Sequence, residues 1–240
     1  MSTRKAKQLI YGVFYALVLA LIVYVVYSIV GLFIPKAPVV VPCTGNCEPV
    51  GASSITASPV WAFTSSPGHD TFLVRITNTN PGWAAQYFDY SINLEDASGT
   101  VLQSIPGSSF IYGAETKYLI APNIAVQAPF TGAALALGNV YWAPGASLGT
   151  APMFTAENVV ATSTADTISV SGQITNTNIS TFRYVFVDVV FMGANGNPVG
   201  ASESEIDNVA PGQAVDFSVF YPQTGGINPV SGQIFVYGLK

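Results

Sequence analysis

The residues that could carry chemistry are few, and the most suggestive group surrounds the single histidine. His69 is next to Asp70 and follows two serines in Ser65–Asp70. A nucleophilic triad needs a base that an acid orients, with all three groups converging in space. Neighbours in one loop seldom converge in that way, so we expect His69 to be a solvated loop residue. The sequence therefore predicts that the chain is not an enzyme.

The densest acidic cluster is formed by Glu203, Glu205 and Asp207. Their spacing of two places them on one face of an extended strand. A calcium ion needs several oxygen ligands around one point, and these three side chains would supply some of them. Charges along a strand also protect its edge from unwanted pairing. We expect a solvated strand edge here, with no bound metal and no cofactor.

The three tryptophans are candidates for stacking on a ligand. Trp61 and Trp142 fall within predicted strands, where a large aromatic side chain usually belongs to the core. Trp83 follows Pro81 and Gly82 in a predicted loop, and an exposed loop tryptophan hints at a contact site. Trp83 is therefore the one candidate contact residue, and a glycan is the ligand class it would suit.

Cys43 and Cys47 are the only cysteines in the chain, and Gly45 and Asn46 between them favour a turn. Outside the cytoplasm a disulfide is the default state of such a pair. A local bridge and a bridge to a second chain both remain open, as does a redox or metal role. Two cysteines with one distant histidine cannot complete a structural zinc site within one chain.

An uncharged apolar run, Leu9–Ile34, predicts a single transmembrane helix at residues 9–34. The run is longer than the core of a signal peptide, and no small-residue cleavage pattern follows it. Arg4, Lys5 and Lys7 precede it, which predicts a cytoplasmic tail at residues 1–8 because cationic flanks stay inside. Residues 35–51, rich in proline, read as a stalk. We thus expect a single-pass cell-membrane protein that contacts lipid through residues 9–34.

The charge distribution argues against nucleic acid as a partner. The net charge is −5, from 13 acidic and 8 basic residues, and all the acidic residues follow the apolar run. The basic residues beyond it are isolated: Lys36, Arg75, Lys117, Arg183 and Lys240. No basic stripe is available for phosphates.

An internal repeat organises the rest of the chain. The segment Ile76–Asn80 recurs without change at Ile174–Asn178. In each copy an alternating apolar strand follows, with Tyr90, Ile92 and Leu94 expected to face inward in the first copy, and Ser91 and Asn93 outward. The matching inward residues of the second copy are Val187, Val189 and Phe191.

Turns rich in glycine, proline and asparagine separate short predicted strands in both copies, and no helical period appears after Pro35. We therefore expect an all-β ectodomain of two tandem immunoglobulin-like β-sandwiches, at residues 52–145 and 152–240, behind one transmembrane α-helix. The boundary falls where glycine and proline cluster, near residues 143–151. Because few contacts cross such boundaries, each sandwich should respond separately to core mutations.

The repeat resembles the bacterial FxLYD-type immunoglobulin-like domain. The run Ile92–Asp96 stands where that family has F-x-L-Y-D, whereas Val189–Gly193 lacks the terminal acid. The resemblance implies an extracytoplasmic β-domain with no catalytic residues to carry over. Together with the predicted anchor, it favours a surface structural or protein-interaction module with an envelope protein as partner. The alternative is a surface module that binds a glycan.

Overall fold

β-strands make up nearly all of the secondary structure. The computed structural model describes residues 54–222 and 229–240. Its strands pair antiparallel, and sheets in pairs enclose apolar cores. The expected all-β sandwich class is therefore confirmed for these residues. The single described helix, α2 (Gly145–Leu148), is four residues long and occupies the predicted boundary segment, where no helix was expected.

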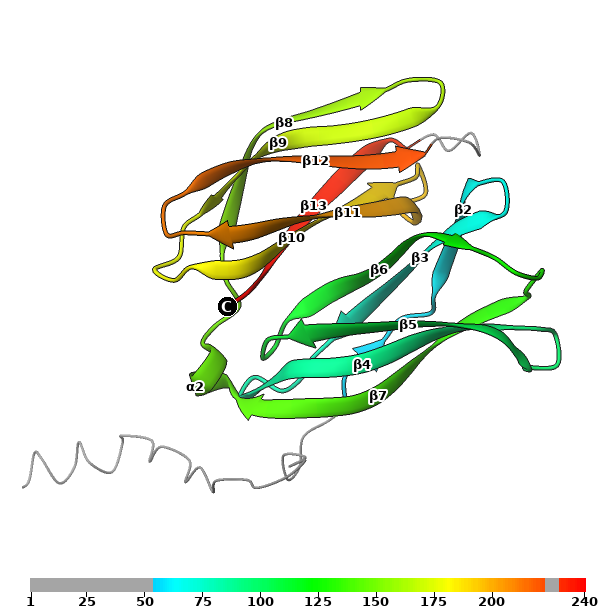
Figure 1. Cartoon of the computed structure of the whole chain (residues 1–240), viewed down its shortest axis with the longest axis horizontal. Coiled ribbons are helices and arrows are strands. Elements are labelled where there is room, and N and C mark those ends of the chain that lie inside the picture. The colour runs from blue at the N-terminus through cyan, green and yellow to red at the C-terminus, as the bar shows by residue number, and fades with distance from the viewer. Residues whose placement is uncertain (1–53, 223–228) are drawn as a thin grey trace, which may run out of the picture. The chain divides into compact units, whose positions relative to one another are not determined.

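The N-terminal sandwich comprises seven strands, which we define here in chain order. They are β1 (Thr56–Ala57), β2 (Trp61–Ser66), β3 (His69–Thr77), β4 (Trp83–Glu95), β5 (Val101–Ile111), β6 (Thr116–Ala125) and β7 (Gly132–Pro144). In one sheet β3 pairs with β6 along its length and with β1 and β2 at its two ends. The other sheet has the order β5-β4-β7. Figure 1 shows β4, β5 and β7 side by side as one layer.

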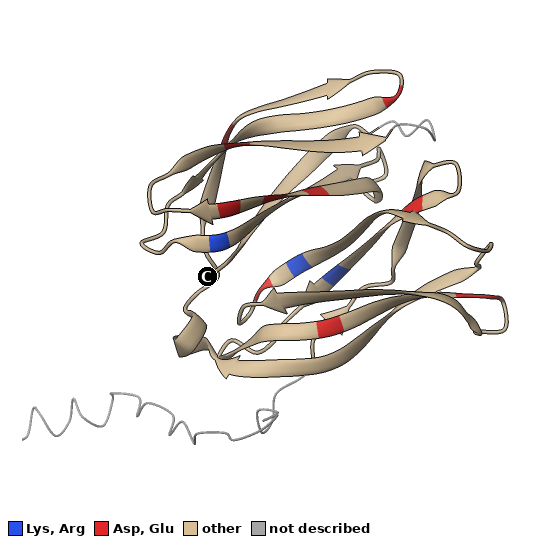
Figure 2. Cartoon of the chain, viewed as in Figure 1, with Lys and Arg blue, Asp and Glu red and all other residues tan. Residues whose placement is uncertain are grey.

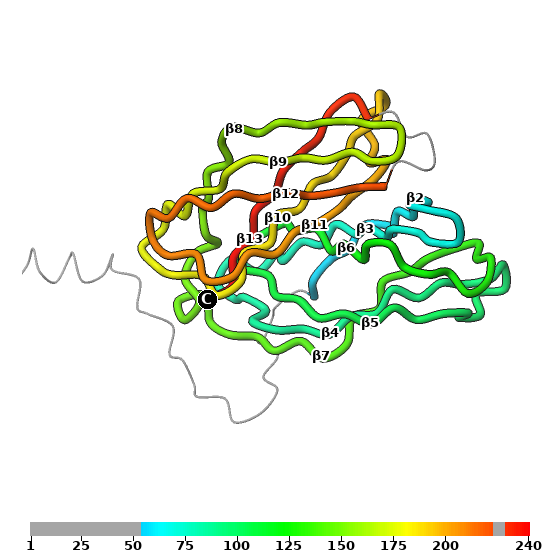
Figure 3. Tube along the Cα trace, turned by 45° about the horizontal axis from the view of Figure 1, so that its top comes forward, coloured from blue at the N-terminus to red at the C-terminus, as the bar shows by residue number. Residues whose placement is uncertain are grey.

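The C-terminal sandwich repeats this plan with six strands. They are β8 (Phe154–Ser163), β9 (Thr167–Asn176), β10 (Phe182–Met192), β11 (Pro198–Val209), β12 (Ala214–Pro222) and β13 (Ser231–Leu239). Its sheets have the orders β12-β9-β8 and β11-β10-β13. The trace in Figure 3 shows β8, β9 and β12 running together as one layer.

The strand alternation read from the sequence sets the core of each sandwich. Ile92 and Leu94 on β4 are 0% and 1% exposed. On β10, Val187 and Val189 are fully buried and Phe191 is 2% exposed. Tyr90 is only partly buried and packs against the same N-terminal core. The predicted register is therefore confirmed, since a slip by one residue would have turned every one of these side chains outward.

The outward residues of β4 are less exposed than the alternation predicts. Ser91 and Asn93 are half-buried rather than solvated. The Ser91 hydroxyl donates to Asn93 Oδ1 at 2.9 Å, and Ser104 on β5 donates to the same oxygen at 2.8 Å. The expectation that both residues face open solvent is therefore wrong, because β4 is the middle strand of its sheet and neighbouring side chains cover its polar face.

On β10 the alternation fails more completely, since both faces are buried. Asp188 is 2% exposed and Val190 is 0% exposed, although both point away from the core that holds Val187 and Val189. Val190 instead joins a cluster with Ala201 on β11 and with two residues of the N-terminal sandwich, Leu73 and Ile120. A strand buried on both faces cannot show a simple polar–apolar alternation.

This cluster is one of several contacts that join the two sandwiches. The Tyr112 hydroxyl donates to the Gly238 carbonyl at 3.0 Å, and the Tyr118 amide donates to the Tyr237 hydroxyl at 3.2 Å. Phe110 and Phe186 also pack with ring centroids 6.1 Å apart. The expected scarcity of contacts across the boundary is therefore wrong, whereas the separate response of the two sandwiches to core mutations stays a prediction.

The repeated Ile-Thr-Asn-Thr-Asn segment forms the same buried corner in each sandwich. In the N-terminal copy Asn78 is fully buried, and its Nδ2 donates to the carbonyls of Trp83 (2.7 Å) and Tyr112 (2.9 Å). Its Oδ1 accepts from the Asn80 amide at 3.0 Å and from Asn80 Nδ2 at 2.9 Å. One side chain therefore closes the loop between β3 and β4 and ties it to the end of β5.

The C-terminal copy repeats this arrangement bond for bond. Asn176 is fully buried, and its Nδ2 donates to the carbonyls of Ser180 (2.9 Å) and Val209 (3.0 Å). Its Oδ1 accepts from the amide and from Nδ2 of Asn178, at 3.0 and 2.9 Å. A buried amide that satisfies loop carbonyls is costly to replace, which explains why this segment is the most exact part of the repeat.

The predicted transmembrane helix at residues 9–34 lies outside the described residues, as do the tail at residues 1–8 and the stalk at residues 35–51. Within residues 54–222 and 229–240, no helix has the length and apolarity needed to cross a membrane.

Candidate functional site

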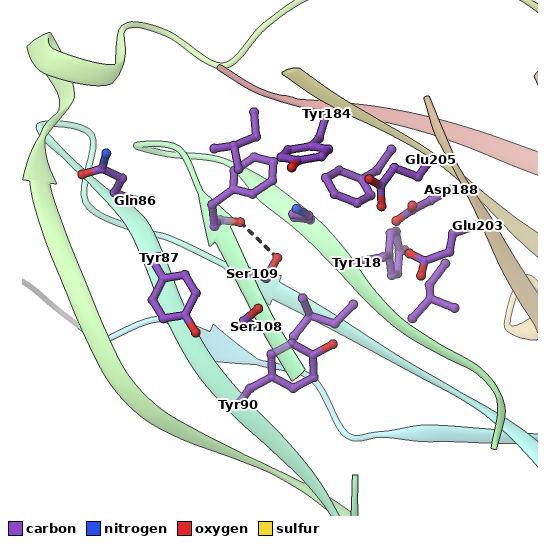
Figure 4. Close-up of a pocket in the computed structure, with 16 residues that line it drawn as sticks. Gln86, Tyr87, Tyr90, Ser108, Ser109, Tyr118, Tyr184, Asp188, Glu203 and Glu205 are labelled. Carbon is purple, nitrogen blue, oxygen red and sulfur yellow. Dashed lines mark hydrogen bonds between the residues drawn. The ribbon is translucent and has the colours of Figure 1, made fainter. Parts of the chain in front are cut away.

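A pocket of about 480 Å³ lies at the junction of the two sandwiches. Strands β4, β5 and β6 supply one wall, and β10 and β11 supply the other. Figure 4 shows Tyr87, Tyr90 and Ser108 on the first side and Asp188, Glu203 and Glu205 on the second. A volume of this size falls in the range of small-molecule sites.

Lys117 on β6 is the cation of the pocket and is only 5% exposed. Its Nζ lies 3.6 Å from the centroid of the Phe110 ring, 5.0 Å from that of Tyr237 and 5.4 Å from that of Phe186. Three ring faces thus stabilise the ammonium. Burial lowers the pKa of Lys117 to about 8, although the nearby carboxyl groups, led by Asp188, act in the opposite direction.

Asp188 faces Lys117 from β10 and is the most buried acid of the pocket. It is directly opposite Glu203 on β11 in the strand register. Within the part of the chain that the structure describes, its carboxyl group accepts no hydrogen bond and forms no direct ion pair. Burial, with repulsion from Glu203 added, raises the pKa of Asp188 well above its ordinary value, while Lys117 partly offsets the effect.

Glu203 and Glu205 complete the acidic wall from β11, an edge strand on which Figure 2 shows acidic residues in red. Both residues are exposed, as is Asp207 farther along the strand. The solvated edge expected from the sequence is therefore present, but two of its three acids also line a pocket. Neighbouring protein atoms still desolvate the Glu203 carboxyl group and raise its pKa, with Lys117 opposing the shift. Because Glu203 stays open to solvent, this desolvation is weaker than that of Asp188.

Aromatic side chains form the remaining walls. The Tyr118 ring packs against the Phe235 ring at an angle of 55°, with centroids 4.9 Å apart. Tyr90 and Tyr184 line the pocket from opposite sandwiches (Figure 4). Burial raises the pKa of Tyr90 to about 12, with further contributions from Glu203 and Asp188.

This arrangement suits recognition of charge. The carboxyl groups can accept hydrogen bonds or hold a cation, and the rings offer flat apolar faces. Among the described residues there is no group of three or more His, Cys, Asp or Glu side chains placed to hold a metal ion.

Trp83, the contact residue predicted from the sequence, does not line this pocket. It is the first residue of β4, opposite Pro144 on β7, rather than part of a loop, and its side chain is half-buried. Trp142 packs against the N-terminal core as expected, and Trp61 packs against the cluster of Leu73 and Val190.

The other sequence candidates are also separate from the pocket. His69 is the first residue of β3 and is half-buried, and its Nδ1 lies 3.3 Å from the Pro67 carbonyl oxygen. The expected loop placement is therefore wrong, because β3 begins at His69. Cys43 and Cys47 lie outside the described residues, and their disulfide stays a prediction.

Sequence reasoning missed Lys117 and Asp188, the two buried charges of the pocket. A signal was present in β10, where the residues between the core positions are Phe186, Asp188 and Val190. Two apolar residues on the supposed solvent face indicate a second buried surface, and a lone acid between them is then a candidate functional group.

No family model matches the sequence, and no curated protein matches it either.

Proposed function

We propose that this chain is a membrane-anchored cell-surface module that acts without catalysis, as a structural and protein-interaction element. Residues 9–34 would anchor it in the cell membrane with residues 1–8 in the cytoplasm. Two immunoglobulin-like sandwiches would then extend outside. The matched strand orders of the two sandwiches and their identical Asn corners support the immunoglobulin-like description.

The observation that carries the interaction role is the exposed edge strand β8. It lies at the edge of the sheet β12-β9-β8, and each of its residues after Phe154 is exposed. Val159 and Val160 present 43% and 58% of their surface to solvent. An exposed, apolar edge strand can pair with a strand of another protein through its backbone. The register of β8 against β9 is irregular between Glu157 and Val160, as at a β-bulge.

The experiment is in-cell crosslinking followed by capture of the full chain from the envelope fraction. We expect an envelope protein, or a second copy of the chain, in the wild-type capture and its loss with Val160→Lys. The matched control is Val101→Lys, because Val101 is 47% exposed on β5, an edge strand of the N-terminal sandwich. Capture that is equal in both variants would contradict the edge-strand role.

The glycan-binding alternative rests on Trp83 alone. The backbone carbonyl of Trp83 accepts a hydrogen bond from Asn78 at 2.7 Å, and its side chain is half-buried, which leaves one part of the ring free for stacking. A glycan array with wild type and Trp83→Ala tests it. A signal that depends on Trp83 would favour this function over the protein-interaction role.

A further inference from the structure

The acidic side chains that line the junction pocket outnumber the basic ones. Among the residues that the structure describes, Lys117 is the only cation that lines it, and it faces Asp188, Glu203 and Glu205. The half-buried Glu115 also acts on Lys117, and it accepts a hydrogen bond from the Tyr112 amide at 2.7 Å. One ammonium group therefore faces several carboxyl groups in a partly desolvated space.

The two described cations of the C-terminal sandwich, Arg183 and Lys240, contact other groups and do not line the pocket. Arg183 is exposed and lies over the ring of Tyr184 at 5.0 Å, and Lys240 donates to the Leu148 carbonyl at 3.3 Å. Lys117 itself lies over the Phe110 ring and forms no direct ion pair among the described residues.

The position of Asp188 opposite Glu203 adds repulsion between two carboxyl groups to this excess of acidic side chains. These acids are direct cross-strand partners, and like charges in that relation destabilise a sheet. The Asp188 side chain is also only 2% exposed, so little water is available to hydrate its carboxyl group when it ionises. An external cation between the two strands would relieve both penalties, and Asp188 is oriented into the pocket where that cation would lie (Figure 4).

We propose that the pocket binds a small organic cation through a primary ammonium group held by Asp188 and Glu203, with its aliphatic part against the aromatic wall. The rings of Tyr90, Tyr118 and Tyr184 supply apolar and π surface for that part. A volume of about 480 Å³ accommodates a diamine or a similar small molecule. A bare metal ion fits less well, because the wall is largely aromatic and offers no three-ligand group among the described residues.

The test is isothermal titration calorimetry of the full chain in detergent, at low ionic strength, with putrescine as the probe. The isosteric neutral probe is 1,4-butanediol. Putrescine should bind and the diol should not. Asp188→Asn should weaken putrescine binding at least about tenfold, since the amide cannot ionise to pair with the ammonium group. Glu203→Gln should weaken it less, because Glu203 is more exposed.

The matched control is Asp207→Asn, which removes an exposed acid from the same strand as Glu203 but outside the pocket. It should leave affinity within about twofold. Lys117→Gln should strengthen binding, because it removes the cation that competes for the acids. This opposite sign separates charge recognition from general damage to the fold.

Three results would overturn the proposal. One is the absence of putrescine binding by the wild-type chain. Another is unchanged affinity in both Asp188→Asn and Glu203→Gln. The third is equal binding of the diol, which would assign the pocket to hydroxyl groups rather than to ammonium. A thermal melt of each variant confirms that folded protein was titrated.

Discussion

Strands β4 and β10 hold equivalent places in the two sandwiches, yet their outer faces differ. Each is the middle strand of its second sheet and supplies core residues at alternate positions. The outer face of β4 carries Ser91 and Asn93, which are half-buried and bond to each other. The outer face of β10 carries Asp188 and Val190, which are buried against the other sandwich.

The difference shows which parts of the repeat are kept and which have diverged. The inner face and the Asn corner are shared because each sandwich needs them to fold. The outer face of β10 has instead become a junction that contains an apolar cluster beside a charged pocket. In this chain the candidate site therefore arises where the two copies differ.

The largest expected effect comes from the shared inner face. Phe191→Ala should lower the free energy of unfolding by about 3–5 kcal/mol, because it leaves a cavity in a packed core. Phe220→Ala is the control, since Phe220 is 62% exposed on β12 and should change stability by less than about 1 kcal/mol. Denaturant unfolding measures both. Equal effects would contradict the assigned register.

The Asn corners provide the most direct comparison of the two copies. Asn78→Ala and Asn176→Ala should each cost about 2–4 kcal/mol, because each leaves two buried carbonyl groups without a donor. The control is Asn139→Ala, an exposed asparagine on β7. Thermal unfolding of the three variants tests this equivalence. A large effect in one corner alone would show that the two corners do not contribute equally to stability.

Asp188 should make stability fall with rising pH. Its pKa is raised in the folded state, so the folded chain holds a proton that the unfolded chain has already lost above the ordinary value of 3.8. The loss of stability begins near that pH and continues to the raised pKa. Asp188→Asn should flatten the decline in melting temperature as the pH rises above about 4. A parallel decline in this variant and in Asp207→Asn would exclude Asp188 as the cause.

The smallest effect concerns the polar outer face of β4. Asn93→Ala removes the acceptor of two hydrogen bonds, from Ser91 and Ser104. Because the site is half-buried and water can replace the lost partner, we expect a cost of about 1 kcal/mol. Chemical denaturation resolves a change of this size. A cost like that of Asn78→Ala would contradict the expectation that water replaces the lost partner at this half-buried site.

Much of the fold could be predicted because it depends on local patterns. The alternation at Ile92 and Leu94 and at Val187 and Val189 gave the strands and their inward faces, and the duplicated segment at Ile76 and Ile174 gave the repeat. The repeat also predicted two similar units. It could not reveal why the segment is duplicated, since the role of Asn78 depends on carbonyl groups of residues far along the chain, such as Tyr112.

The candidate site could not be predicted because it depends on how the sandwiches pack. Lys117 and Asp188 come from different sandwiches and meet only at the junction. Glu203 and Glu205 were recognised as an acidic face, but no sequence pattern shows that this face meets a buried lysine. Trp83 seemed a loop residue because Pro81 and Gly82 precede it, whereas β4 begins one residue later.

Hydrogen exchange of the full chain with Leu73→Ala tests most directly whether the sandwiches share one junction. Leu73 is fully buried on β3 in the cluster that contains Val190 of β10. The account predicts faster exchange in peptides from β10 and β11 as well as from β3, because loss of one cluster member loosens both sandwiches. Faster exchange confined to β1–β7, with β8–β13 unchanged, would contradict it.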